Sequence, residues 1–80
     1  MDGITLKCNP SDDFNSNYWL CTILIDKDKT GVDYEELRVA LDAKGIETRP
    51  LWKPMHLQPV HRNSPCYVDG TSEHLFNQGL

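Results

Sequence analysis

The run Tyr18-Trp-Leu-Cys-Thr-Ile-Leu-Ile-Asp26 carries the clearest strand signal in the sequence. Aromatic and β-branched residues dominate it, and both of its faces are nearly apolar. A strand of this kind belongs in the centre of a sheet, where other layers cover both faces. Because 80 residues supply little material for such cover, the sequence indicates that a partner surface is missing.

A helix with recognisable ends follows this strand, from Asp33 to Gly45. Asp33 is suited to the N-cap, and Glu36 completes a capping-box pattern with it. Gly45 is placed for the left-handed residue that ends a helix. Helical spacing also produces one apolar stripe, which we expect to be core and which contains Tyr34, Leu37, Ala40 and Leu41.

Charged residues surround this helix. The segment Asp26–Gly31 is predicted to be a solvated turn, since it is too short for a calcium-binding loop and lacks the closing Glu. On the exposed face of the helix, Arg38 is predicted to pair with both Glu35 and Asp42.

Two further strands are predicted. Ile46–Arg49 follows the helix directly and is halted by Pro50, and Gly3–Lys7 is a third candidate near the N-terminus. Strand, helix and strand with short connections predict a small α+β layer in which the helix covers one face of the sheet.

The remaining segments are loops and a final helix. Turn-forming residues fill Asn9–Asn17, and Arg62–Gly70 is a second predicted loop. Prolines at 50, 54 and 59 predict an extended, stiff loop without regular structure from Trp52 to Val60.

The last ten residues predict a helix. Thr71 and Ser72 form its predicted N-cap pair, and Gly79 is placed at the C′ position. Leu75 and Phe76 are expected to face inward. Since the sequence stops after one more apolar residue, we expect a domain that is cut rather than finished.

Composition excludes several classes of protein. Hydrophobic residues make up 39% and charged residues 25%, which is typical of a globular chain. A net charge of -4 argues against a nucleic-acid partner. No apolar stretch is long enough for a bilayer, and the N-terminus lacks the pattern of a signal peptide. We therefore expect a cytoplasmic chain with no membrane partner.

The three cysteines are Cys8, Cys21 and Cys66. Their odd number and wide spacing favour reduced thiols, with Cys21 buried in its strand. A metal site would need His56 and His61 together with a distant cysteine, but the matching C-x2-4-C motif is absent. We therefore expect no metal site.

The loop that follows the helix holds the candidate binding residues. His56 could bond a phosphate or a sugar hydroxyl in either protonation state, or it could have a structural hydrogen-bonding role. Lys53 could offer a point charge to a phosphate or could be an ordinary surface lysine. Trp52 is expected to be a packing anchor for the loop. Arg49 could either pair with a carboxylate or contact a ligand.

No complete catalytic constellation accompanies these residues. The sequence contains no G-x-S-x-G, P-loop or H-E-x-x-H motif, and its carboxylates cluster on the helix and the flanking turns. His61 and His74 are expected on the surface. Residue chemistry alone therefore predicts a binding surface and no catalytic residue.

Several of these motifs together resemble a known family. Gly45-Ile-Glu-Thr-Arg-Pro50 is followed by Trp52-Lys-Pro-Met-His56 and by the closing Thr71-Ser-Glu-His-Leu-Phe-Asn-Gln-Gly-Leu80. Their combination and order resemble the C-terminal segment of the DegT/DnrJ/EryC1/StrS family of sugar aminotransferases. The resemblance covers nearly the whole chain.

The resemblance implies a fold, a cofactor and a reaction. The fold would be the small C-terminal domain of the aspartate-aminotransferase fold, a short, mostly antiparallel sheet covered by helices. Residues 1–80 would form a single partial domain of an enzyme that uses pyridoxal phosphate. Such an enzyme transfers an amino group, usually from glutamate, to a keto group of a nucleotide-linked sugar in polysaccharide or glycan biosynthesis.

The resemblance also separates this chain from the whole enzyme. The family's large domain, which supplies the cofactor lysine, would be absent, so we expect an inactive chain that binds no pyridoxal phosphate. His56 would contact the nucleotide-sugar or the cofactor region, with Lys53 and Gln58 in the same motif, and the family implies a homo-oligomer. The alternative is a stand-alone binding or self-association module that keeps the small-domain fold.

Overall fold

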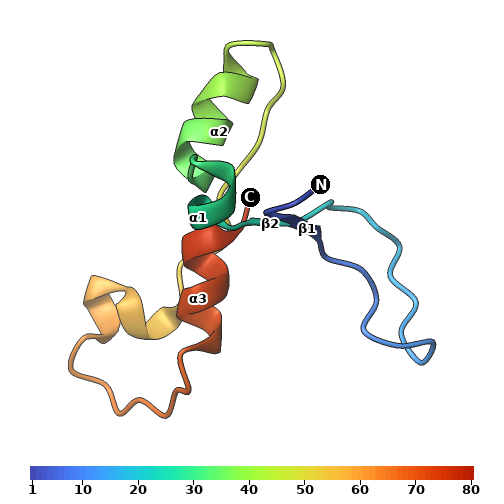
Figure 1. Cartoon of the computed structure of the whole chain (residues 1–80). Coiled ribbons are helices and arrows are strands. Elements are labelled where there is room, and N and C mark those ends of the chain that lie inside the picture. Colours follow the sequence, from blue (N-terminus) through green and yellow to red (C-terminus); the bar gives the residue numbers. More distant parts are fainter.

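The computed structural model describes residues 1–80. In chain order, its elements are β1 (Ile4–Leu6), β2 (Ile23–Ile25), α1 (Lys27–Thr30), α2 (Tyr34–Asp42), the 3-10 turns η1 (Met55–Leu57) and η2 (Pro59–His61), and α3 (Thr71–Gln78). A small sheet lies at the centre, and α2, α3 and the loop between the strands extend from it in different directions (Figure 1). The predicted α+β class is confirmed.

The strand predicted at Tyr18–Asp26 appears as β2, and its predicted central position in the sheet is confirmed. β1 pairs with β2 in antiparallel register, with Ile4 opposite Ile25 and Leu6 opposite Ile23. On the other edge of β2, Ile23 and Leu80 exchange two backbone hydrogen bonds of 3.0 Å each. The C-terminal residues therefore add a third pass of chain to the sheet beside β2.

The predicted length of this strand is wrong, because β2 covers only three of the nine residues. Its partner β1 ends at Leu6, and the last bond between the two segments runs from Lys7 N to Thr22 O over 2.9 Å. Beyond it, the amides of Tyr18 and Trp19 donate to the side chains of Ser16 and Asn17 at 3.0 Å each. Such local side-chain bonds compete with sheet pairing.

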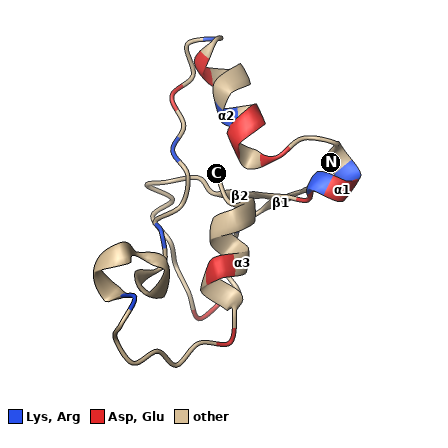
Figure 2. Cartoon of the chain, turned by 90° about the vertical axis from the view of Figure 1, so that its left-hand side faces the viewer, with Lys and Arg blue, Asp and Glu red and all other residues tan.

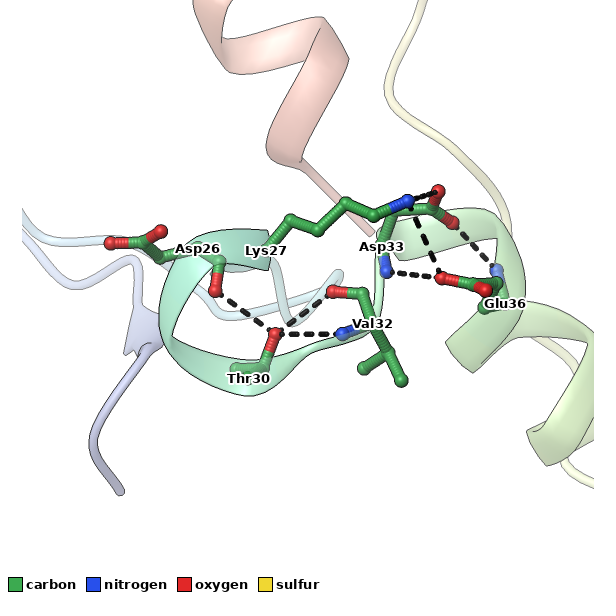
Figure 3. A network of polar contacts seen from close by, with 6 residues as sticks. All are labelled: Asp26, Lys27, Thr30, Val32, Asp33 and Glu36. Carbon is green, nitrogen blue, oxygen red and sulfur yellow. Dashed lines mark hydrogen bonds and ion pairs between the residues drawn. The ribbon is translucent and has the colours of Figure 1, made fainter.

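The charged segment after β2 is a one-turn helix, α1, and not the predicted turn. Asp26 caps it by accepting a hydrogen bond from the amide of Asp28 over 3.1 Å. Thr30 Oγ1 donates to the carbonyl oxygens of Asp26 and Val32 at 2.9 and 2.8 Å (Figure 3). These bonds fix the connection from β2 to α2.

Both predicted ends of α2 are confirmed. Asp33 N donates to Glu36 Oε2 over 2.8 Å, and Glu36 N donates to Asp33 Oδ1 over 2.9 Å, which completes the capping box. At the other end, Gly45 has φ +76°, and the amide of Ile46 reaches back to Leu41 O over 3.0 Å. This is the left-handed closure that glycine favours.

The predicted ion pairs of α2 differ in outcome. Arg38 Nη2 lies 2.7 Å from Glu35 Oε1, as predicted. The predicted ion pair between Arg38 and Asp42 does not form, because no Arg38 nitrogen lies within 4.0 Å of an Asp42 carboxylate oxygen.

The prediction that the apolar stripe of α2 is core is wrong. Tyr34, Leu37 and Leu41 are half-buried, Ala40 is exposed, and the helix contains no fully buried residue. The predicted strand Ile46–Arg49 does not form either. Because the strand predicted after α2 is missing, the chain does not return along the sheet beneath the helix. α2 extends away from the β1–β2 sheet (Figure 1). The helix that packs against β2 is α3.

The proline-rich segment contains regular structure, contrary to prediction. Pro54 directly precedes η1, and Pro59 is the first residue of η2. Proline is compatible with the first position of a helical turn, since its missing N–H has no partner there in any case. The turns are closed by hydrogen bonds from Leu57 N to Pro54 O and from His61 N to Gln58 O, both 3.0 Å.

The helix α3 forms as predicted, but both predicted caps are wrong. Gly70 is the N-cap, and the carboxylate of Asp69 accepts the amide of Thr71 over 2.9 Å. Gly79 has an extended backbone, φ -91°, instead of the left-handed conformation. The reason is its bridge to Leu24 in β2, which requires extended geometry. Leu75 and Phe76, expected to face inward, are half-buried.

The core is small for the length of the chain. Ile25 and Leu80, exposed by 2% and 7%, are its only buried hydrophobic residues. The accessible surface is 6726 Å², against about 4,900 Å² for a folded monomer of this mass. The radius of gyration is 14.6 Å, against about 11.6 Å for a compact chain. The chain therefore buries little of its apolar surface, as expected for 80 residues.

None of the helices combines the length and the apolar character that crossing a membrane requires.

Candidate functional site

The candidate site lies where η1 approaches α3. His56, in η1, has a side chain that is 17% exposed, and its Nε2 atom lies 3.7 Å from Glu73 Oε2 on α3. That separation exceeds hydrogen-bond length, and Nε2 is buried without any partner. Because a buried polar atom is normally hydrogen-bonded, the imidazole has unused bonding capacity.

Gln58 closes the loop on itself. Its Nε2 atom donates to the carbonyl oxygen of Lys53 over 3.0 Å and approaches Met55 Sδ at 3.6 Å. The amide group thus ties the start of the loop to η1. Lys53 itself is exposed and makes no ion pair. The structure therefore places His56, Lys53 and Gln58 in one short segment, and only Gln58 and Lys53 are joined by a hydrogen bond.

The neighbours of these residues differ from expectation in two cases. Trp52 is 85% exposed, so its predicted role as a packing anchor is wrong. Arg49 donates to Glu47 Oε1 from Nε at 3.0 Å and from Nη2 at 2.7 Å, which favours the carboxylate pair over a ligand contact. His61 is half-buried instead of fully on the surface, whereas His74 is exposed as predicted.

Sequence reasoning did not find Glu73 in this site, nor the buried hydroxyl of Thr48 elsewhere in the chain. Glu73 approaches His56 from a helix that begins well after η1 in the chain, and no spacing rule connects the two positions. Thr48 has a buried Oγ1 atom without a hydrogen-bond partner, although the sequence predicts it inside a strand. Both positions depend on how distant segments pack, so no local pattern could have shown them.

The strongest electrostatic network lies outside this site. Charged residues gather on α1 and α2, whereas η1 and η2 carry few of them (Figure 2). Lys27 Nζ lies 2.8 Å from Asp33 Oδ2 and 3.7 Å from Glu36 Oε2 (Figure 3). The hydrogen bond to Asp33 raises the pKa of Lys27, and the same bond lowers the pKa of Asp33. This network joins α1 to α2 and has a structural role.

The residues present do not fit pyridoxal phosphate, the cofactor that the resemblance to sugar aminotransferases implies. A cofactor lysine needs a desolvated or cationic environment that lowers its pKa. All lysines here are exposed, and the hydrogen bond to Asp33 raises the pKa of Lys27 instead of lowering it. An open groove at the start of α3, lined by residues from Tyr67 to Leu75, contains no lysine and none of the candidate site residues. No cluster of three His, Cys, Asp or Glu residues is placed to hold a metal ion.

Comparison with known proteins relates the chain to an aminotransferase. No protein-family model matches the chain, and no solved structure is a significant match. A Bacillus subtilis (strain 168) protein named "Putative pyridoxal phosphate-dependent aminotransferase EpsN" is 35% identical over 69 residues. The match covers 81% of this chain, which spans 17% of the length of that relative. Over most of its length, the chain is therefore related to part of a protein named as a pyridoxal phosphate-dependent aminotransferase.

Proposed function

We propose that this chain acts as a segment of a pyridoxal phosphate-dependent sugar aminotransferase of the DegT/DnrJ/EryC1/StrS family. The enzyme would move an amino group from glutamate to a keto group of a nucleotide-linked sugar in polysaccharide biosynthesis. The observation that carries this proposal is the 35% identity over 69 residues to the Bacillus subtilis relative. The small α+β fold is consistent with a small-domain fragment of an aminotransferase.

Within that enzyme, the segment binds substrate and performs no bond-making step. His56 is suited to a hydroxyl oxygen of the nucleotide-sugar, because its Nε2 forms no hydrogen bond in the chain and a hydroxyl, unlike a phosphate, is compatible with the Glu73 carboxylate 3.7 Å away. Lys53, three residues earlier in the loop and exposed, offers a positive charge to a phosphate of the same substrate. Gln58 holds the loop in shape through its bond to Lys53 O. The cofactor and its lysine would come from outside these 80 residues.

A chimera tests this function directly. The matching segment of the Bacillus subtilis relative is replaced by this chain, and glutamate-dependent amination of nucleotide-linked keto-sugars is measured as formation of 2-oxoglutarate. We expect activity in the chimera and in the unaltered relative, and none in the 80-residue chain alone. A folded chimera that binds pyridoxal phosphate but aminates none of the sugars used by the unaltered relative contradicts the proposal.

The role of His56 is tested in the same chimera. We expect His56→Ala to raise KM for the nucleotide-sugar by about tenfold, the effect of losing one good hydrogen bond. The KM for glutamate should stay unchanged. His74→Ala is the matched control, since His74 is exposed and lies outside the loop. If the two substitutions change KM for the nucleotide-sugar equally, His56 does not contact the substrate.

A second candidate function is a self-association module, and the exposed surface favours it. The chain exposes about 1,800 Å² more than a compact monomer of its mass, which is more than the roughly 800 Å² that each partner buries in a stable interface. Large apolar side chains are exposed in the strand-connecting loop and near η1, namely Phe14, Tyr18, Trp19, Leu20, Trp52, Met55 and Val60. Sedimentation of the 80-residue chain separates the two candidates, because a monomer at all concentrations contradicts self-association.

A further inference from the structure

The pairing of β1 with β2 brings two cysteines into register. Each pair in this ladder is fixed by the next, as Ile4 faces Ile25 and Leu6 faces Ile23. The hydrogen bond from Lys7 N to Thr22 O, 2.9 Å long, continues the same register one residue further. The next pair in that register is Cys8 opposite Cys21.

The type of this pair suits a disulfide. Lys7 with Thr22 and Gly3 with Asp26 are joined by ladder hydrogen bonds, the latter from Asp26 N to Gly3 O over 2.8 Å. Since bonded and non-bonded pairs alternate, one more pair in the same register would make Cys8 and Cys21 a non-hydrogen-bonded pair, for which Cα atoms lie about 4.5 Å apart. A disulfide spans Cα separations of roughly 4.4–6.8 Å.

Both thiols also share one face of the sheet and are accessible. Side chains alternate along a strand, so Cys8 follows Leu6 on the same face, and Cys21 lies two residues before Ile23. Both cysteines are free and exposed, so the prediction that Cys21 is buried in its strand is wrong. They lie just beyond the paired ends of β1 and β2, at the two ends of the connecting loop, and their exposure leaves them open to a soluble oxidant.

We propose that Cys8 and Cys21 form a reversible disulfide that adds one rung to the sheet and closes the loop between β1 and β2. The oxidant is a small disulfide such as oxidised glutathione. The thiolate of one cysteine attacks it, which forms a mixed disulfide and releases one glutathione thiolate. The second cysteine thiolate attacks the protein sulfur of that mixed disulfide and releases the second glutathione. Two protein thiols are oxidised, one small disulfide is reduced, and the two protons pass to the released thiolates.

Cys66 provides an internal comparison, because it is equally free and exposed but lies in another loop. Closing Cys8 to Cys21 makes a ring of 14 residues, and closing Cys21 to Cys66 makes one of 46. Chain statistics alone favour the smaller ring by about sixfold. If strand register favours the Cys8–Cys21 disulfide over Cys21–Cys66, the ratio of the two must exceed sixfold in the folded chain and must fall to about that value when the sheet is unfolded.

The experiment equilibrates the complete 80-residue chain with reduced and oxidised glutathione, in buffer and in concentrated urea. Peptide mass mapping after acid quenching gives the amount of each disulfide and hence the effective concentration of each thiol pair. We expect the Cys8–Cys21 disulfide to dominate in buffer, with an effective concentration at least about tenfold above that in urea. Equal values in buffer and urea overturn the proposal, as does a majority of disulfides that contain Cys66.

A shifted cysteine provides the matched control. The double variant Leu20→Cys/Cys21→Ser shortens the ring by one residue and moves the thiol away from the register position opposite Cys8, into the bend at Leu20. Chain statistics predict no change, whereas register predicts an effective concentration at least about tenfold lower in buffer. Cys66→Ser should leave the wild-type value unchanged. A double variant that closes as readily as the wild type overturns the register argument.

Discussion

The side chain of Thr48 carries a hydroxyl group that forms no hydrogen bond. Its Oγ1 atom is buried. An unsatisfied buried hydroxyl is destabilising, and an apolar group of the same shape removes that penalty. We therefore expect Thr48→Val to raise the free energy of unfolding by about 1 kcal/mol, measured by urea titration. Thr48→Ala is the control, because it removes the hydroxyl but also a methyl group. A loss of stability in Thr48→Val would mean that the hydroxyl is bonded in solution.

Asp33 and Lys27 make the junction of α1 and α2 sensitive to pH in both directions. The hydrogen bond to Lys27 lowers the pKa of Asp33 below its ordinary value of 3.8, so the native state binds this proton less tightly than the unfolded state. The contribution of Asp33 is therefore present above pH 3.8 and lost as pH falls through its native pKa. The pKa of Lys27 is raised above 10.5, so its contribution is present below pH 10.5 and lost as pH rises further.

The measurement is far-ultraviolet circular dichroism against pH. We expect the helical signal of the wild-type chain to fall at both extremes of pH. In Asp33→Asn, which keeps a capping side chain but removes the charge, the signal should be lower at neutral pH and the acid step smaller. An acid step of the same size in both proteins would assign that step to other carboxylates.

At the scale of elements, Gly79 joins α3 to the sheet. A Cβ atom at this position would overlap the side chain of Leu51 and lie 2.8 Å from Leu75 O. The conformation itself, φ -91°, is open to any residue, so the need for glycine is steric. We expect Gly79→Ala to destabilise the chain by roughly 1–3 kcal/mol through overpacking.

Gly45→Ala is the matched control for that prediction. Gly45 needs a left-handed backbone, φ +76°, but a Cβ atom there meets nothing within 4 Å. Its cost should be roughly 1–2 kcal/mol and confined to the end of α2. Amide hydrogen exchange separates the two, because only Gly79→Ala should speed exchange at Ile23 and Leu80. Unchanged exchange at both amides would show that the bridge to β2 tolerates the added methyl group.

The elements that the sequence predicts well are those stabilised by near neighbours. Asp33 and Glu36 bond each other's backbone within one turn, so a short pattern suffices to find the start of α2. The strand predicted at Ile46–Arg49 failed because a strand needs a partner, and none lies beside it. The candidate site divides in the same way: the motif around His56 is local, whereas its contact with Glu73 arises only when η1 and α3 meet.

At the scale of the whole molecule, the chain should not retain pyridoxal phosphate at a defined lysine. All lysines are exposed, and Asp33 raises the pKa of Lys27, which disfavours the free amine that condenses with an aldehyde. After mixing with pyridoxal phosphate and borohydride reduction, we expect only scattered modification, equal in native and urea-treated samples. Mass mapping checks this expectation. Selective, native-dependent labelling of one lysine would contradict it.

The exposure of both tryptophans has a practical consequence for spectroscopy. Trp19 and Trp52 are 83% and 85% exposed, so their indole rings sit in water in the native chain as they do in the unfolded chain. Intrinsic fluorescence should therefore barely report unfolding. Instead, a blue shift of the emission should mark the moment when another surface covers the loop between β1 and β2 or the segment around η1, because burial removes water from the indole.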